Sequence, residues 1–167
     1  TCGRFNPPYR RLKHFSAIDC FILDIDHLGT HEINMQLLRE KLAMDDRIVL
    51  LFTSPGNDGL KLLFRLIETV YDTGKFSMFY KLFARQFAGQ YALQNVMDTK
   101  TSDVTRACFL SVDEEAYFNP EALPVDMKAI INFESTQEVA EAQKLFKEEE
   151  QQQKQEAKEE PREELPE

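Results

Sequence analysis

The sequence predicts an α+β fold in which helices cover one face of an antiparallel sheet. Three observations lead to this prediction. Short apolar runs rich in branched and aromatic residues alternate with two segments of helical periodicity. Their order is strand, helix, strand, strand, helix, strand. Two of the strands are joined by a loop so short that they must run antiparallel, and this order favours helices on the same side of the sheet.

The first half of this unit is a strand, a helix and a strand. Residues 17–26 are mostly apolar up to Ile25, as in a strand that is covered on both faces. Thr30 is a candidate N-cap for a helix that runs to about Met44 and has one apolar stripe. Residues 47–53 are again mostly apolar, which predicts a second buried strand.

The second half begins with a glycine-bearing loop and repeats the pattern. The strand predicted at 60–67 returns antiparallel to the one before it. Residues 76–93 carry phenylalanines and tyrosines at helical spacing, which predicts a long helix with an aromatic core face. Residues 105–111 form the fourth predicted strand. The resulting βαββαβ order is that of the ferredoxin-like or RNA-recognition-motif (RRM) arrangement.

Composition divides the chain into four parts: a basic N-terminal segment at 1–15, the βαββαβ domain at 16–133, a C-terminal helix at 134–147, and an acidic Glu/Gln-rich linker or disordered tail at 148–167. In the first part, arginines and a lysine alternate with Phe5 and Tyr9. This composition suits a surface that follows a nucleic-acid strand. Solvated charges on a partly ordered edge segment explain it equally well.

Charge and cysteine content bound the partners and the location. The 167 residues carry a net charge of −9, which argues against a protein that coats nucleic acid non-specifically. A mildly acidic domain can still hold a basic groove. No apolar run reaches transmembrane length, so no membrane partner is expected. The three cysteines show no C-x-x-C spacing, and their odd number argues against a disulfide framework and for a reducing, cytoplasmic location. The start at Thr1, without a methionine or signal peptide, suggests an excised fragment.

Two carboxylates at the end of the first predicted strand are the strongest candidates for chemistry. Asp24 and Asp26 are two positions apart, so a strand places both on one face. Neither has an obvious cationic neighbour in the sequence. A hard divalent cation relieves the repulsion between two such carboxylates, so the pair predicts a Mg²⁺ or Mn²⁺ site. A pair of solvated aspartates is the alternative.

The loop between the second and third predicted strands is a candidate phosphate site. Its glycines would let backbone N–H groups point at an anion, and a hydroxyl and a lysine lie nearby. A triphosphate is the natural ligand for such a loop, although the P-loop spacing is absent and an ordinary hairpin turn explains the loop alone. The candidate nucleotide-binding residues here are Ser54, Gly56, Asn57, Gly59 and Lys61.

A third feature follows the aromatic helix. Asp98 comes after two apolar residues and would complete a three-carboxylate site, with Asp103 as a competing candidate. Arg106 would pair with phosphate oxygens. A loop carboxylate and a surface ion pair are the alternative interpretation. His27 would either support the site from behind or be an ordinary solvated histidine.

Together these motifs resemble the catalytic prim-pol domain of the archaeo-eukaryotic primase (AEP) superfamily. The similarity is greatest to the branch of VirE N-terminal-like domains and CRISPR-associated primase-polymerases, and it covers about residues 12–132. The matching motifs are FILDID at 21–26, the turn and strand at 53–64, Met97 and Asp98, and RACFLSVD at 106–113. Many family members have histidine where Lys61 stands, so the phosphate contact here would carry a permanent charge.

The resemblance implies that residues 16–133 are a catalytic domain for metal-dependent, template-directed nucleotide addition in DNA replication. Asp24, Asp26 and Asp98 would hold two Mg²⁺ or Mn²⁺ ions, and the substrates would be dNTPs or NTPs on single-stranded or primed DNA. A fused helicase or CRISPR adaptation proteins would be the protein partners. A non-catalytic nucleic-acid-binding module and a metal-dependent phosphohydrolase or nuclease are the alternatives.

Overall fold

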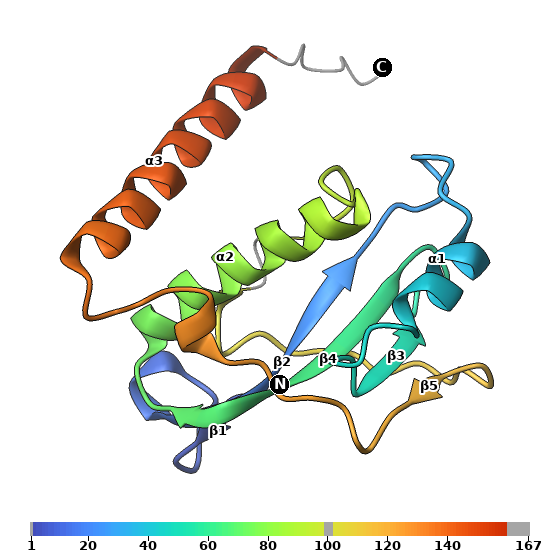
Figure 1. Cartoon of the computed structure of the whole chain (residues 1–167), viewed down its shortest axis with the longest axis horizontal. Helices are drawn as coiled ribbons and strands as arrows, with labels where there is room; N and C mark the ends of the chain where they lie inside the picture. Colours follow the sequence, from blue (N-terminus) through green and yellow to red (C-terminus); the bar gives the residue numbers. More distant parts are fainter. Residues whose placement is uncertain (1, 99–101, 160–167) are drawn as a thin grey trace, which may run out of the picture. The chain divides into compact units, whose positions relative to one another are not determined.

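A computed structural model describes residues 2–98 and 102–159 (Figure 1). The chain divides into two compact units, Thr1–Ile130 and Ile131–Glu167. The first is an α+β domain built on a five-stranded sheet, and the second contains the C-terminal helix. Among the described residues, no helix has the length and apolar character needed to cross a membrane.

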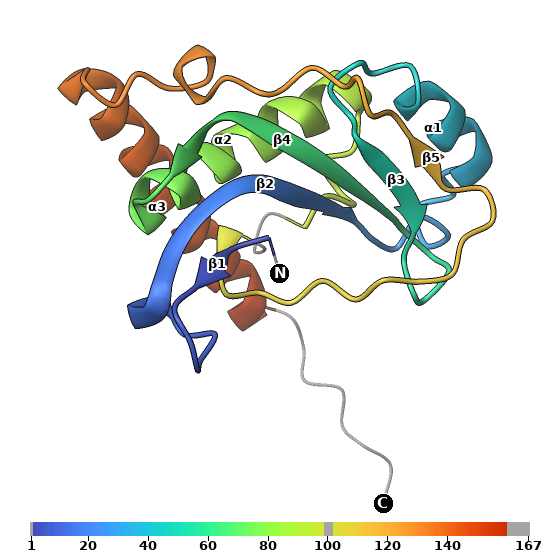
Figure 2. The same ribbon diagram turned by 90° about the horizontal axis from the view of Figure 1, so that it is seen from below.

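The sheet is antiparallel throughout and has the order β1-β2-β4-β3-β5. Its two long strands, β2 (Phe15–Ile25) and β4 (Leu60–Val70), lie side by side at the centre and curve together (Figure 2). The shorter strands are β1 (Arg4–Phe5), β3 (Leu50–Thr53) and β5 (Tyr117–Phe118). The predicted antiparallel return of the third strand on the second is confirmed as the β3–β4 pair.

Helix α2 (Thr73–Tyr91) supplies the aromatic core over β2 and β4. Phe21 of β2 stacks on Phe64 of β4 with ring centroids 5.2 Å apart, and Phe83 of α2 meets Phe21 edge-on at 5.1 Å. All three side chains are essentially buried. The aromatic stripe predicted for this helix is therefore confirmed as core. Because side chains alternate along a strand, the face of β2 that it covers is opposite the face that carries Asp24.

Helix α1 (Met35–Leu42) is shorter than the sequence suggested. Its N-cap is Asn34, which accepts a hydrogen bond from the Leu37 amide at 3.0 Å, and not Thr30. The preceding loop contains His27 and Glu32 at positive φ, so the chain turns twice before a helix can begin.

The prediction of a fourth strand at 105–111 is wrong. No strand is assigned there, and Phe109 and Leu110 are 74% and 77% exposed. This part of the chain runs as an extended segment from the β1 side of the sheet to the β3 side (Figure 2). The strand that flanks β2 opposite β4 is instead β1, from the N-terminal segment. The exact RRM-like order is therefore not confirmed.

The second unit consists mainly of α3 (Thr136–Glu159). Ser135 Oγ accepts a hydrogen bond from the Glu138 amide at 3.3 Å, and the Glu138 carboxylate accepts one from the Asn132 amide at 3.0 Å. Ser135 therefore caps the start of α3. Helical backbone continues past residue 147 into the segment predicted as linker or tail, and residues 160–167 of that segment lie outside the described part of the chain.

Candidate acidic site at the end of β2

Asp24 and Lys61 form a buried ion pair across the two central strands. They are direct partners in the β2–β4 register, and Lys61 Nζ donates to Asp24 Oδ2. Their side chains are only 10% and 13% exposed for Lys61 and Asp24 respectively. The cation missing from the sequence around Asp24 is therefore supplied by the neighbouring strand.

The other carboxylate oxygen of Asp24 is left without a partner. Within the described residues, Asp24 Oδ1 is the buried side-chain oxygen or nitrogen that has no hydrogen-bond partner. A buried acceptor that stays unsatisfied costs about 1–3 kcal/mol, and native proteins rarely keep one without a reason. This atom is where a ligand would restore a lost interaction.

Backbone pairing brings Asp98 to the same edge. The Asp98 amide donates to the Asp24 carbonyl at 2.9 Å, and the Asp26 amide donates to the Val96 carbonyl at 2.9 Å. Ile25 and Met97 form an isolated antiparallel bridge between these bonds. The segment before Asp98 thus adds a short strand-like contact to the end of β2. Main-chain hydrogen bonds therefore place Asp24, Asp26 and Asp98 next to one another at the end of β2.

The electrostatics of Asp26 agree with this convergence. Burial raises the pKa of Asp26 above its ordinary value, and the nearby negative charges of Asp24 and Asp98 raise it further. Lys61 and His27 partly oppose this effect. His27 is itself exposed. Burial and the neighbouring negative charges therefore destabilise the ionised form of Asp26, and a bound cation would reduce this repulsion.

Arg106 provides a second basic group. Its Nη2 lies 3.2 Å from Asp98 Oδ2, and its side chain remains 48% exposed. Asp103, the competing candidate, accepts hydrogen bonds at 2.8 Å from both the amide and the hydroxyl of Thr105. Asp103 therefore closes its own turn, whereas Asp98 is hydrogen-bonded to β2 beside Asp24.

These residues fit a magnesium or manganese ion only if other ligands complete its coordination shell. Among the described residues, no group of three or more His, Cys, Asp or Glu side chains is arranged to hold a metal ion. Magnesium is commonly bound by one or two carboxylates, with the phosphates of a substrate and water completing its shell. Asp24, with its unsatisfied oxygen, and Asp26 fit that pattern. The ligand set of Asp24, Asp26 and Asp98 around two ions stays a prediction.

The loop at 54–59 is a tight hairpin turn. The Ser54 amide donates to the Gly59 carbonyl and the Asn57 amide to the Ser54 carbonyl, both at 2.9 Å. Ser54 is buried and Asn57 has a φ of 56°. These two amides are therefore committed to the turn, and its phosphate-binding role remains a prediction. Gly56 is open, with no heavy atom within 4 Å of an added Cβ.

Gly59 explains how closely this turn approaches the acidic site. A Cβ at Gly59 would lie 2.2 Å from the Ile25 carbonyl oxygen and 3.0 Å from Asp26 Oδ1. Only glycine allows this contact between the turn and the end of β2. The turn is also tied to the loop after β2, because Asp58 Oδ1 accepts the Gly29 amide at 2.7 Å.

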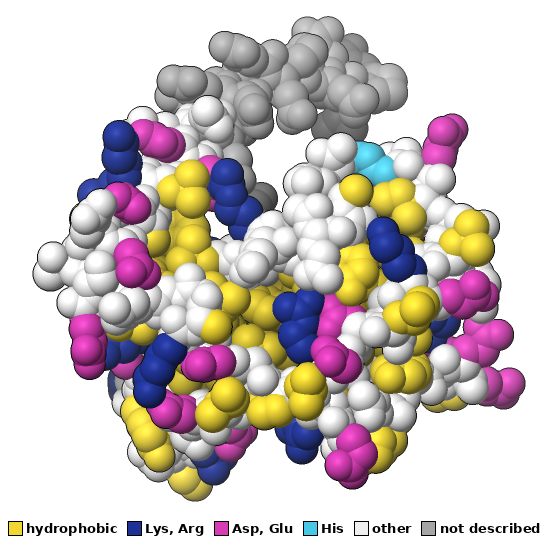
Figure 3. Space-filling model, viewed as in Figure 1, with side chains coloured by type: hydrophobic (Ala, Val, Ile, Leu, Met, Phe, Trp, Pro, Cys, Tyr) yellow, Lys and Arg dark blue, Asp and Glu magenta, His cyan; other side chains and the backbone are white. Residues whose placement is uncertain are grey.

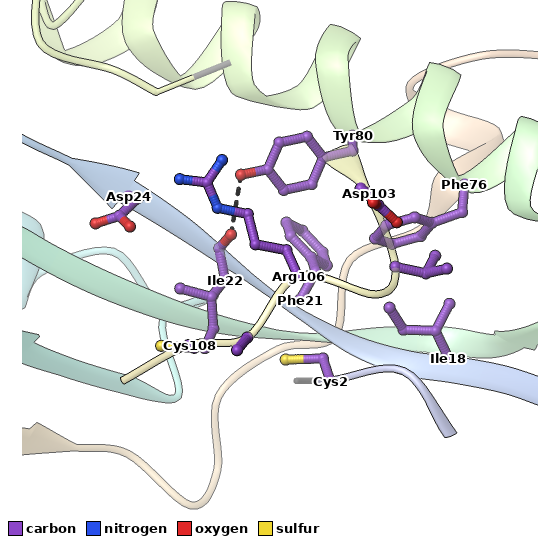
Figure 4. Close-up of a pocket in the computed structure, with 12 residues that line it drawn as sticks. Cys2, Ile18, Phe21, Ile22, Asp24, Phe76, Tyr80, Asp103, Arg106 and Cys108 are labelled. Carbon is purple, nitrogen blue, oxygen red and sulfur yellow. Dashed lines mark hydrogen bonds between the residues drawn. The ribbon is translucent and has the colours of Figure 1, made fainter. Parts of the chain in front are cut away.

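A pocket adjoins Asp24 on the side of α2 (Figure 4). Phe21, Phe76 and Tyr80 give it an aromatic wall, while Arg106 and Asp103 bring charge to it. The Tyr80 hydroxyl donates to the Ile22 carbonyl at 3.0 Å and so fixes the ring. Figure 3 shows basic and acidic side chains beside hydrophobic surface below α2. The helical periodicity of the aromatic residues predicts a core position, and periodicity alone cannot show that some of them also line a pocket.

A hydrogen-bond network that the sequence did not predict joins α1, the end of β3 and the segment after Cys108. Arg39 of α1 is buried and donates to Asp113 Oδ2 at 2.8 Å. The Thr53 amide donates to the same oxygen at 2.7 Å. This places the extended segment after Cys108 against the end of β3. The residues involved are far apart in the sequence, so no local signal identifies them.

Comparison with known proteins assigns the family. No curated protein and no solved structure matches the chain. The family model described as "BT4734-like, N-terminal domain" matches residues 1–118, which is most of the chain. The assignment to the AEP prim-pol domain is therefore wrong, and the helicase and CRISPR partners that rested on it have no support in the structure. The chain belongs to the BT4734-like N-terminal domain family.

Proposed function

We propose that this domain is a metal-dependent nucleotidyltransferase that adds nucleotides to a nucleic-acid strand on a template. The observation that carries the proposal is the meeting of Asp24, Asp26 and Asp98 at the end of β2, beside Lys61 and Arg106. Carboxylates next to basic groups suit a reaction in which a divalent cation and a phosphate chain must be held together.

The acidic residues would bind the cation and position the reacting groups. Asp24 and Asp26 would hold Mg²⁺ or Mn²⁺, with Asp98 as the third carboxylate. The chemistry that a cation held by these residues would supply is activation of a 3′-hydroxyl and charge stabilisation of the leaving pyrophosphate. Asp24 would engage it through Oδ1, the oxygen that has no partner in the free protein.

The basic residues would hold the triphosphate. Lys61 is paired with Asp24 in the free protein. The Lys61 ammonium has three donor hydrogens, so it would serve a phosphate oxygen as well as Asp24. Arg106 is half exposed and presents a planar guanidinium to the same region. The aromatic pocket beside Asp24 would receive the sugar or base of a dNTP or NTP.

One observation favours a second candidate, a nucleic-acid-binding module without catalysis. The Lys61–Asp24 pair neutralises one acid, and no ready-made group of three metal ligands exists among the described residues. Both candidates place the protein with cellular nucleic acid. A cytoplasmic location agrees with the three cysteines, all of them described and free.

The two candidates differ in metal-dependent product formation. The chain is incubated with primed and unprimed single-stranded DNA, dNTPs or NTPs, and Mn²⁺ or Mg²⁺, beside Asp24→Asn and Asp26→Asn. Elongated products from the parent and none from the variants support nucleotidyl transfer. Retained DNA binding without products in any sample supports the binding module. Shortened strands or released phosphate indicate a phosphohydrolase or nuclease instead.

A further inference from the structure

One segment of this acidic protein is basic, because it contains no acidic residue. Residues 1–18 contain Arg4, Arg10, Arg11 and Lys13 and no Asp or Glu, so they carry +4. The rest of the chain must then carry −9 − 4 = −13. A separation of charge this strong within one chain marks a surface that attracts anions.

Arg10, Arg11 and Lys13 lie on a closed loop between β1 and β2, residues 6–14, whereas Arg4 lies in β1 and pairs with Asp19. The Asn6 amide donates to the His14 carbonyl at 2.8 Å, which closes the loop at its base. The side chains of Arg10, Arg11 and Lys13 are exposed, and none pairs with an acidic group within residues 2–98 and 102–159. The loop therefore presents three positive charges to solvent.

An aromatic ring lies among these charges. Tyr9 is 53% exposed, and the Arg11 guanidinium carbon lies 4.9 Å from its ring centroid. The His14 ring is 5.9 Å from the Tyr9 ring. An exposed tyrosine supported by an arginine offers a flat face on which a base can stack, while the neighbouring cations reach phosphates.

We propose that the 6–14 loop binds single-stranded nucleic acid, with Arg10, Arg11 and Lys13 on phosphates and Tyr9 stacked on a base. The loop precedes β2, while the acidic site follows it, at the opposite end of that strand (Figure 2). Ten residue steps of β-strand give β2 a length of about 33 Å along its path, comparable to about ten stacked nucleotides, and its curvature brings the two ends closer than that. The loop would thus hold a nucleic-acid strand at a distance from the acidic site. Binding by the loop would require neither a cation nor catalysis at the acidic site.

Fluorescence anisotropy with a labelled oligothymidylate of about 20 nucleotides tests the loop directly. The whole chain is titrated in EDTA at low and moderate salt. The variant Arg10→Gln/Arg11→Gln/Lys13→Gln should bind at least about ten-fold more weakly and show a shallower dependence on salt. Tyr9→Ala should weaken binding by about ten-fold with the salt dependence unchanged.

The matched control is Lys128→Gln/Lys144→Gln/Lys147→Gln, which removes the same charge elsewhere. It should bind within about two-fold of the parent. Equal loss in the control, no binding by the parent, or equal binding of duplex DNA overturns the proposal. So does tighter binding to phosphatidylserine vesicles that depends on the same loop residues. Circular dichroism spectra that match the parent's show that each variant is folded.

The Asp26→Asn variant separates this inference from the proposed function. It should lose nucleotide addition and keep oligonucleotide binding, because Asp26 lies at the far end of β2 from the loop. Loop variants that bind the oligonucleotide as well as the parent contradict the inference about the loop. That result does not bear on the proposed function of the acidic site.

Discussion

Lys61 and Asp24 face each other across β4 and β2, and their ion pair is almost completely removed from water. Two charges in such a position lose much of their hydration, and hydrophobic residues of similar size often stabilise a fold as well or better. The pair is therefore weak evidence for stability and stronger evidence that at least one of the two charges has another task.

The first prediction concerns this pair. Lys61→Met should reduce the free energy of unfolding by about 3 kcal/mol, because it leaves Asp24 buried without a cation. The double variant Asp24→Asn/Lys61→Met should recover most of that loss. Urea unfolding at neutral pH measures both. If the double variant is as unstable as Lys61→Met, the unpaired charge is not the cause.

Sequence could identify the carboxylates but not their cation. The apolar run before Asp24 and the two-residue spacing to Asp26 are local features, so they predict a strand that ends in an acidic pair. Lys61 reaches Asp24 only through the register of two strands, and register depends on the whole hydrophobic pattern of the sheet. The same limit hid the contact between Arg39 and Asp113.

The second prediction compares two glycines of one turn. Gly59→Ala should destabilise the protein by about 1–3 kcal/mol or more, since its Cβ would collide with the Ile25 carbonyl oxygen at the acidic site. Gly56→Ala meets no atom and should change stability by less than about 1 kcal/mol. Thermal unfolding gives both values. Equal effects would contradict the tight approach of the turn to β2.

The failed strand at 105–111 has an equally physical cause. A run of apolar residues such as Cys108, Phe109 and Leu110 is typical of a strand in a sheet. In the structure Phe109 and Leu110 are exposed, and the N-terminal β1 occupies the edge of β2. Composition cannot show which of two segments pairs with the edge of β2. The long aromatic helix was predictable because its many apolar residues repeat at one period.

The third prediction concerns pH and the cation. The pKa of Asp26 is raised, so its ionised form is disfavoured in the folded, metal-free protein at neutral pH. Asp26→Asn should therefore stabilise the metal-free protein at neutral pH, and the gain should vanish as the pH falls to the ordinary carboxyl range. Denaturant unfolding in EDTA across this range measures it.

The same titration should control Mn²⁺ binding. Binding should weaken as the pH falls through the raised pKa of Asp26, because a protonated carboxyl is a poor ligand. Titration calorimetry with Mn²⁺ should show this dependence in the parent and a much smaller one in Asp26→Asn. Binding of equal strength and pH dependence in both proteins would remove Asp26 from the cation site.

The fourth prediction concerns the network that holds the extended segment to β3. Burial alone would raise the pKa of Asp113, but hydrogen bonds from Thr53 and from Arg39 outweigh it and lower that pKa well below the ordinary value. The ionised carboxylate therefore stabilises the fold above the ordinary carboxyl pKa, and this contribution is lost as the pH falls below it. Asp113→Asn should cost about 3 kcal/mol at neutral pH, because it leaves the Arg39 guanidinium buried without its partner.

The difference between Asp113→Asn and the parent should narrow in acid, because the unfolded parent takes up a proton at the ordinary carboxyl pKa while folded Asp113 stays ionised. Urea unfolding at neutral pH and below about pH 4 measures the change. Glu114→Gln is the matched control, because Glu114 is an exposed acidic neighbour and its loss should matter little at either pH. A difference that stays constant between the two conditions would mean that the charge of Asp113 does not hold the segment, and that the shape of its hydrogen bonds does.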